Sequence, residues 1–387
     1  NRIESIARGT AVPEDYTEID LAGKTIMPGI IDAHAHGPYA GDDIIPQQNW
    51  NLLAHLALGV TTVHNPSSSA KSAFAAAEYA RTDRILGPRI FSTGEIVYGA
   101  KSTSWAPIDN LDDALAHVRR LAAQGAISVK NYNQPRREQR QQVIEAARQE
   151  GLISVAEGGS LYQLDMSMIA DGITGIEHNV PTLKMYDDVH QFWRQSGAGY
   201  TPTLVVTYGG LTSEDYFYQN TEVWKHPILS NFVPPSQLQA RSVRRVTAPE
   251  EDYRDDDSAA AAKILMDAGI MVNIGAHGQR EGLASHWEMW SFARGGFSPM
   301  EALATATINP ARHLGMDKDI GSLEAGKLAD LVIVDANPLD DIRNTDRISH
   351  VMINGRLYRA GDLSEEVTGT ATLSPFHWQT TPQGAIR

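Results

Sequence analysis

Short apolar runs alternate with longer amphipathic stretches along most of the chain. The runs are rich in β-branched residues and end in Gly, His, Asp or Asn, which is typical of buried parallel strands. Eight runs are predicted as strands, at 30–36, 60–64, 89–93, 127–132, 152–157, 174–178, 200–206 and 270–277.

Helical patterns separate these strands. The stretch 110–123 begins with an Asn cap and repeats apolar residues every three or four positions, and 137–150 behaves similarly. Strands that alternate with helices predict a parallel sheet, and eight such units predict closure into a barrel. The predicted fold class is therefore α/β, a (β/α)8 TIM barrel over residues 27–324.

One connection, 208–257, is longer than a simple crossover and is rich in Tyr, Trp and Pro. Long loops on such barrels commonly serve the active site. The alternative is a surface excursion with two helices.

The pattern changes near the C-terminus. A helix is predicted at 299–307, then a continuous apolar strand at 328–335 and a hairpin at 348–358 around the turn dipeptide Asn354-Gly355. Together with the first strands of the chain, these segments predict a small β-sandwich formed by residues 1–26 and 325–387.

Composition narrows the classes of partner and metal site. The 47 acidic and 33 basic residues give a formal charge of -14, which disfavours nucleic acid and anionic membranes as partners. With no cysteine, a metal must be held by His, carboxylate or modified Lys. No apolar run approaches the roughly 20 residues of a membrane span, so we expect a soluble protein, in cytoplasm or periplasm. The chain opens on Asn1 in a strand-like stretch, which suggests a piece of a longer protein.

His34 and His36 are the strongest candidates for chemistry. They stand at i and i+2 at the end of the first predicted barrel strand, so both side chains face the same side. Active sites of these barrels lie at the C-terminal strand ends. An isolated His-x-His arises by chance, but its position here favours a metal site.

Two distant motifs carry a family resemblance. The stretch 28–36, Pro-Gly-Ile-Ile-Asp-Ala-His-Ala-His, resembles the opening signature of the amidohydrolase superfamily, and 309–312 with 321–332 resembles that family's exit into its β-sandwich. The resemblance spans nearly the whole chain, and it is to the prolidase- and imidazolonepropionase-like branch.

The resemblance implies a metal centre at the strand ends. Lys130 stands where the binuclear branch carries a carbamylated lysine that bridges two metals, and His178 matches the histidine of the sixth strand. The alternative for Lys130 is a purely structural role in a buried ion pair with a carboxylate, because a lysine inside an apolar strand must be neutralised or paired. His64 is interpreted as a capping or supporting histidine.

Two positions depart from the family pattern. The fifth strand usually ends in His but here offers Glu157, and the eighth usually ends in Asp but here offers His277. The two departures resemble an exchange that keeps the total of four His, one carboxylate and one Lys. We therefore predict two divalent ions, zinc in preference to Mn or Fe, with the ligand set His34, His36, Lys130, Glu157, His178 and His277.

Glu157 and His277 are also the candidates for proton transfer, and Glu157 is preferred because a metal-bound imidazole nitrogen cannot act as a base. Tyr132, Tyr208 and His286 are candidates for substrate binding. The two tyrosines can equally pack in the barrel mouth, and His286 can simply lie at the start of a helix.

The predicted function is metal-dependent hydrolysis of a carbon–nitrogen bond in a small amide or dipeptide-like molecule. The rivals are a cyclic-amide hydrolase or deaminase of the same superfamily and a non-catalytic binding protein. Gly-Ala-His-Gly at 275–278 and His-Trp-Glu-Met-Trp at 286–290 resemble amidohydrolase modules that follow TolB-type β-propellers. The resemblance implies such a propeller ahead of this chain. Assembly into a homo-oligomer is a further alternative.

Overall fold

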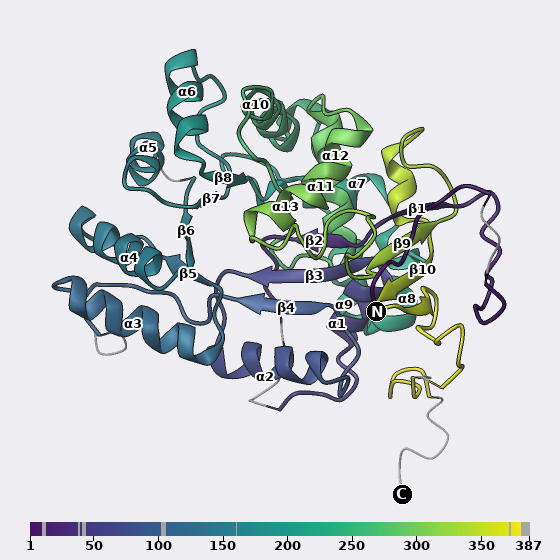
Figure 1. The fold of residues 1–387 in the computed structure, drawn as a ribbon. Coiled ribbons are helices and arrows are strands. Elements are labelled where there is room, and N and C mark those ends of the chain that lie inside the picture. The colour runs from purple at the N-terminus through teal and green to yellow at the C-terminus, as the bar shows by residue number, and fades with distance from the viewer. Residues whose placement is uncertain are drawn as a thin grey trace, which may run out of the picture.

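The computed structural model describes residues 1–9, 13–37, 39–40, 44–101, 106–159, 161–370 and 373–380. Two parallel sheets form its centre (Figure 1). The first holds β2 (Ile30–Asp32), β3 (Val60–Asn65) and β4 (Arg89–Ser92) in that order. The second holds β5 (Ser128–Asn131), β6 (Ile153–Glu157), β7 (Gly175–Glu177) and β8 (Gly199–Thr201). The α/β class with parallel strands in sequence order is as predicted.

Single bridges continue the strand order between the two sheets. Val97 pairs in parallel with Asn131, and Tyr200 with Val272. The amide of Ala33 donates to the carbonyl of Ile274 (3.3 Å), so the segment after Val272 returns to β2. The sheets themselves stay open, so a closed ring of eight strands is not what the described residues form.

The last two predicted strands need correction. The seventh ends at Thr201, and a 3-10 turn, η1 (Leu204–Val206), follows where strand was expected. Of the described residues 270–277, only Val272 makes a β-bridge. The amides of Gly275 and Ala276 donate to buried carboxylates instead of to a neighbouring strand, so no ladder forms there.

Helices lie along the outer side of the strands (Figure 1). The predicted helix at 110–123 is α3 (Leu111–Gln124), whose Asn110 side chain accepts from the amide of Asp113, and the one at 137–150 is α4 (Arg137–Gln149). The predicted helix at 299–307 is α12 (Pro299–Thr305). The other helices of the barrel part are α1 (Trp50–Ala57), α2 (Ala70–Arg81), α5 (Tyr162–Ala170), α6 (Asp187–Ser196), α10 (Asp255–Asp267), α11 (Leu283–Arg294) and α13 (Ile308–His313).

The long connection 208–257 is itself largely helical. It contains α7 (Ser213–Asn220), η2 (Val223–Lys225), α8 (Leu229–Phe232), α9 (Pro235–Val243) and η3 (Glu250–Asp252). Phe217 of α7 stacks on Trp287 of α11, with ring centroids 5.4 Å apart. The connection is therefore packed onto the barrel helices, and its first residue, Tyr208, reaches the site described below.

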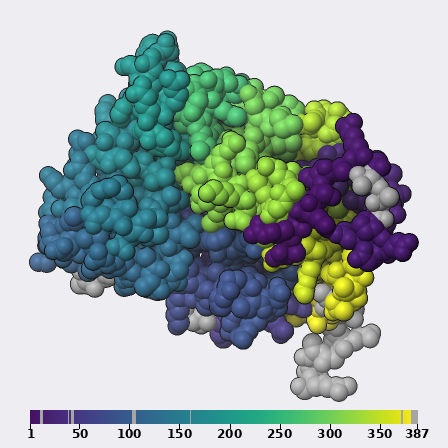
Figure 2. Space-filling model, viewed as in Figure 1, coloured from purple at the N-terminus to yellow at the C-terminus, as the bar shows by residue number. Residues whose placement is uncertain are grey.

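Both ends of the described chain meet in an antiparallel sheet, β1 (Thr25–Pro28), β9 (Leu331–Val334), β10 (Ile348–Ile353) and β11 (Arg356–Arg359), with η4 (Ile342–Asp346) beside it. The predicted hairpin is present, and Asn354 (φ 53°) and Gly355 (φ 75°) take the left-handed backbone that its tight turn requires. The purple and yellow ends lie side by side in Figures 1 and 2. A sandwich needs a second sheet, and the described residues form one sheet here.

The parallel strands β3, β5, β7 and β8 are buried on both faces along their whole length. Trp193 and Trp287 are among the largest fully buried side chains. Within the described ranges, no helix has both the length and the apolar character that crossing a membrane demands.

Candidate metal centre

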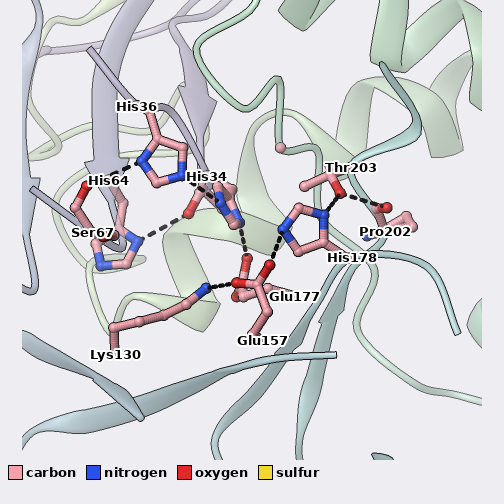
Figure 3. Close-up of polar contacts among 12 residues, drawn as sticks. His34, His36, His64, Ser67, Lys130, Glu157, Glu177, His178, Pro202 and Thr203 are labelled. Carbon is pink, nitrogen blue, oxygen red and sulfur yellow. Dashed lines mark hydrogen bonds and ion pairs between the residues drawn. The ribbon is translucent and has the colours of Figure 1, made fainter. Parts of the chain in front are cut away.

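Four imidazole rings converge at the carboxyl ends of the parallel strands. The ring centroid of His34 lies 4.9 Å from that of His36, 5.1 Å from that of His178 and 5.0 Å from that of His277. The ligand nitrogens of His34, His36 and His277 all lie within 4.8 Å of one another. Residues from the first, sixth and eighth strand positions thus share one site (Figure 3 draws His34, His36 and His178).

Backbone contacts hold the strand-one and strand-eight positions together. The amide of His277 donates to the carbonyl of His34 (2.6 Å). A Cβ on Gly278, where φ is 76°, would lie 2.0 Å from the carbonyl oxygen of His36, so only glycine fits. His178 and His277 both have left-handed φ, 70° and 57°, which is uncommon outside glycine and turns each ring toward the cluster.

The outer nitrogens of His36 and His178 are fixed by hydrogen bonds. Nδ1 of His36 lies 2.9 Å from Oδ1 of Asn65 and 3.2 Å from the carbonyl of Ser67, so Nδ1 must be the protonated nitrogen. The hydroxyl of Thr203 donates to the carbonyl of Pro202 and therefore accepts from Nδ1 of His178 (2.7 Å). In both histidines Nε2 is thus the nitrogen that faces the inside of the site.

His34 follows the same pattern through a buried carboxyl group. Its Nδ1 lies 2.6 Å from Oε2 of Glu177, and both side chains are almost fully buried. Burial raises the pKa of Glu177 to about 8, against the opposing charge of Lys130. With that pKa Glu177 is a neutral carboxyl group at pH 7. A carboxyl group in contact with the outer nitrogen of a ligating histidine orients the ring of that ligand.

These donors fit a divalent metal ion. Nε2 of His34 and Nε2 of His36 lie 3.2 Å apart. Two ring nitrogens at that distance share either a proton or a cation, and two nitrogens on one tetrahedral zinc, at about 2.1 Å each, are separated by about 3.4 Å. Burial lowers the pKa of His34 well below its usual value and that of His277 to about 3, with the neighbouring imidazoles adding to the effect, so both rings are neutral at pH 7.

Lys130, Glu157 and His178 form a second group at the cluster. Nζ of Lys130 lies 2.8 Å from Oε2 of Glu157, and Nε2 of His178 lies 3.0 Å from Oε1 (Figure 3). Burial alone would raise the pKa of Glu157, but the contact with His178 and the charge of Lys130 outweigh burial and hold that pKa well below its usual value. Glu157 is therefore anionic and can act as a ligand.

Tyr208 closes this second group from the long connection. Its hydroxyl donates to Oε1 of Glu157 (3.2 Å), and its ring stacks on His178 with centroids 4.9 Å apart. Asn179 clamps its backbone, accepting from the amide (2.7 Å) and donating to the carbonyl (3.2 Å). A Cβ on Gly159 would lie 2.4 Å from the ring, so that glycine leaves the space the ring occupies.

The structure brings together all six predicted ligand residues and Tyr208. Tyr132 is half-buried, and its ring packs edge-on against that of Tyr98, with centroids 6.4 Å apart. His286 contacts other residues: it is fully buried on α11, with Nε2 2.9 Å from the carbonyl of Leu58. His64, interpreted as supporting, lies between the carbonyl of Ala33 (2.9 Å) and the hydroxyl of Ser128 (2.7 Å).

Sequence reasoning missed the groups behind the ligands, chiefly Asn65, Glu177 and Thr203. Glu177 had a usable signal, because it precedes His178 in a short strand and alternation places it on the inward face with Gly175. Asn65 is the last residue of β3 and Thr203 follows β8, and at both positions no local pattern identifies the partner.

A model of the amidohydrolase family matches residues 25–358. The imidazolonepropionase of Symbiobacterium thermophilum is 62% identical over 39 residues, which are 10% of this chain and only 9% of that protein. A probable imidazolonepropionase of Nematostella vectensis is 23% identical over 390 residues, covering 92% of this chain and 87% of its own.

Among solved structures, a Xaa-Pro dipeptidase with bound methionine in its active site superposes with a TM-score of 0.69 at 22% identity, covering 93% of both chains. At that identity the likeness concerns the fold. The family match supports more than the fold, because it runs from β1 to β11 and includes all four clustered histidines. The chain belongs to the amidohydrolase family.

Proposed function

We propose that this protein is a metal-dependent hydrolase that cleaves a carbon–nitrogen bond in a small amide or dipeptide-like substrate. The observation that carries the proposal is the inward convergence of the Nε2 atoms of His34, His36 and His178, each with its Nδ1 in contact with a polar group behind it. Imidazoles that are oriented from behind in this way are typical metal ligands. His277 completes the set from the eighth strand position.

The finer architecture belongs to the same proposal. The two parallel sheets and the 270–277 segment act as one (β/α)8 barrel over 27–324, and residues 1–26 and 325–387 as a small β domain. Two divalent ions, zinc in preference to Mn or Fe, would be held by His34, His36, His178, His277, Glu157 and a carbamylated Lys130. The three histidines His34, His36 and His277 form the first position, and His178 with Glu157 the second.

A bound divalent ion supplies an activated water and polarises the scissile carbonyl. The protein's own groups do the rest. His277, neutral at pH 7, serves as ligand and not as acid. Glu157 accepts the proton released from the attacking water and returns it to the leaving nitrogen. Carbamylation of Lys130 would replace its ammonium by a carbamate, which would end the ion pair between Lys130 and Glu157.

Tyr208 and Tyr132 are the proposed substrate contacts. The Tyr208 hydroxyl lies 3.2 Å from Oε1 of Glu157, and 41% of the residue is exposed to solvent. The hydroxyl can therefore turn and donate to an oxyanion that forms beside the Glu157 carboxylate. His286, the third predicted contact, would act only from behind the barrel wall, since its ring is fully buried.

One observation favours a one-metal alternative. As an amine, Lys130 already neutralises Glu157 at 2.8 Å and occupies the place of a second cation. A cyclic-amide hydrolase or deaminase with one ion at the three-histidine position would have this form. The non-catalytic alternative would keep the ligands without turnover.

Metal analysis of the purified protein tests the proposal, with Lys130→Ala alongside. We expect two ions per wild-type chain and at most one in the variant. One ion in both proteins would replace the two-metal form by the one-metal alternative, and none in either would overturn the metal site. A panel of dipeptides, N-acyl amino acids and cyclic amides, assayed with added Zn or Mn, then separates linear from ring-opening hydrolysis, and ammonia release identifies a deaminase. No turnover from a metal-loaded protein would favour the binding protein.

A further inference from the structure

Helix α11 carries a fully buried carboxylate that has no part in the chemistry above. Glu288 accepts from the amide of Val205 at Oε1 (2.7 Å) and faces the amide of Gly275 at Oε2 (3.4 Å). Its side chain is completely shielded from solvent. Both amides belong to segments that lead to proposed metal ligands.

The Gly275 side leads to His277. This segment has almost no strand pairing, so its position depends on other hydrogen bonds. The next amide, of Ala276, donates to Oδ1 of Asp32 (3.1 Å), and Asp32 in turn accepts from the hydroxyl of Ser285 (2.8 Å), one turn before Glu288 on α11. Three successive amides, 275 to 277, are thus fixed by the helix and by the first strand.

The Val205 side leads to His178. Val205 lies in the 3-10 turn two residues after Thr203, whose hydroxyl accepts from Nδ1 of His178 (2.7 Å). Thr203 has a left-handed φ of 49°, so the turn needs outside support to persist. The Glu288 carboxylate joins this turn to the eighth strand position by hydrogen bonds, beside the direct packing of Thr203 against Gly275.

Aromatic packing against α7 holds α11 in place. Trp287 stacks on Phe217 (5.4 Å, 18° between planes), and Trp290 packs edge-on against the same ring (5.4 Å). Phe217 belongs to α7 of the long connection. The His-Trp-Glu-Met-Trp stretch therefore holds Glu288 between two tryptophans that the long connection immobilises.

We propose that Glu288 is a positioning residue of the metal centre: it sets the separation of His277 from His178 by joining the backbone segments that carry or support them. Their ring centroids are 5.0 Å apart. Because the carboxylate touches neither ring, its effect is on ligand geometry and metal affinity. The inference rests on the proposed metal site.

Glu288→Gln is the sharpest variant, because the amide keeps an acceptor for Val205 but turns an NH2 toward the Gly275 amide. Co²⁺ is the probe, since its visible d–d bands report ligand geometry and its dissociation constant is measured by competition with a chromophoric chelator. We expect a 10- to 100-fold weaker Co²⁺ affinity, the range for groups behind metal ligands, with altered bands. Ser291→Ala, buried on the same helix and directed toward Asp255 of α10, should match wild type.

Unchanged affinity and bands in Glu288→Gln would overturn the positioning role. An equal loss in Ser291→Ala would also overturn it, since general loosening of α11 would then suffice. Glu288→Asp, a carboxylate too short to reach both amides, takes the place of the Gln variant if that protein does not fold, and is judged by the same two readouts. Wild-type protein that binds no Co²⁺ would overturn the metal site itself, which is a distinguishable result.

Discussion

Nζ of Lys130 lies 2.8 Å from Oε2 of Glu157, and 1% of the lysine side chain is exposed to solvent. Removing one partner of a buried ion pair leaves the other charge buried and unpaired, which destabilises the folded protein. A substitution of either Lys130 or Glu157 therefore affects both residues. Removing the lysine charge leaves an unpaired carboxylate beside His178, and a cation is then needed in its place.

Lys130→Met should therefore lose most hydrolytic activity and one bound metal ion. Methionine keeps the volume but supplies neither a cation nor a carbamate. Atomic emission measures the metal, and intact mass of the wild-type protein before and after mild acid detects a labile CO2 adduct. Arg120→Met, an exposed cation on α3, is the control that should keep activity. Full activity in Lys130→Met would contradict the assignment.

Tyr208→Phe should reduce kcat by about a hundredfold, the effect of losing one oxyanion donor, with a smaller change in KM. The phenyl ring keeps its stack on His178, so folding and metal content should stay as in wild type. Steady-state kinetics check the split between kcat and KM. Tyr216→Phe, on α7 away from the cluster, is the matched control, and an equal fall in both variants would exclude a specific role.

Gly159→Ala should harm the site through Tyr208. The added methyl would lie 2.4 Å from the ring, at a backbone φ of 85° that alanine adopts at a cost of about 1–3 kcal/mol. We expect the Gly159→Ala protein to have a lower melting temperature and also the reduced kcat of Tyr208→Phe. Gly151→Ala is a useful comparison, because φ there is 70° but nothing lies near the added carbon. It should show the stability loss without the kinetic defect.

Stability should fall with rising pH because of Asp165. Burial raises the pKa of this α5 carboxyl from 3.8 to about 7, only partly offset by the amide of Gly159. A raised folded-state pKa gives stability that is complete below pH 3.8 and is lost as pH rises through about 7. Within that window the group contributes a slope of about 1.4 kcal/mol per pH unit.

Chemical denaturation at several pH values, with Asp165→Asn for comparison, measures this slope. The variant should lose the dependence between pH 4 and 7 and retain that of other groups. Parallel curves for the two proteins would mean that Asp165 ionises freely in the folded state.

Metal removal should lower the melting temperature. Without a cation, the Nε2 lone pairs of His34 and His36, 3.2 Å apart, lose the charge between them. An ion at a hundred times its dissociation constant stabilises the folded state by about 2.7 kcal/mol. Thermal melts with chelator and with restored Zn²⁺ measure the difference, and His277→Ala should reduce it. An identical melt in chelator would argue against metal binding at these histidines.

The features predicted correctly from the sequence are those that depend on residues close together along the chain. The strand and helix order, the Asn110 cap and the Asn354-Gly355 turn each depend on neighbours within a few positions, and each is present. The His-x-His pair was accessible for the same reason, since alternation within one strand places both rings on one face.

Errors arose where distant groups compete for the backbone. Residues 270–277 have the apolar pattern of a strand, yet Asp32 and Glu288 take the amides of Ala276 and Gly275. His286 sits near His277 in sequence, but a helix carries it to the carbonyl of Leu58. No local pattern could show either, because the partners are far away along the chain.

The pairing of β1 with β9 has a consequence for how the protein is made. Thr25 lies opposite Val334, so β1 is synthesised about 300 residues before the strand that it pairs with. Until β9 follows, the hydrogen-bonding groups of β1 have no native partner and form an unpaired strand edge. Pairing of β1 with β9 is then a late step of folding, because it needs the whole stretch between them to have been made.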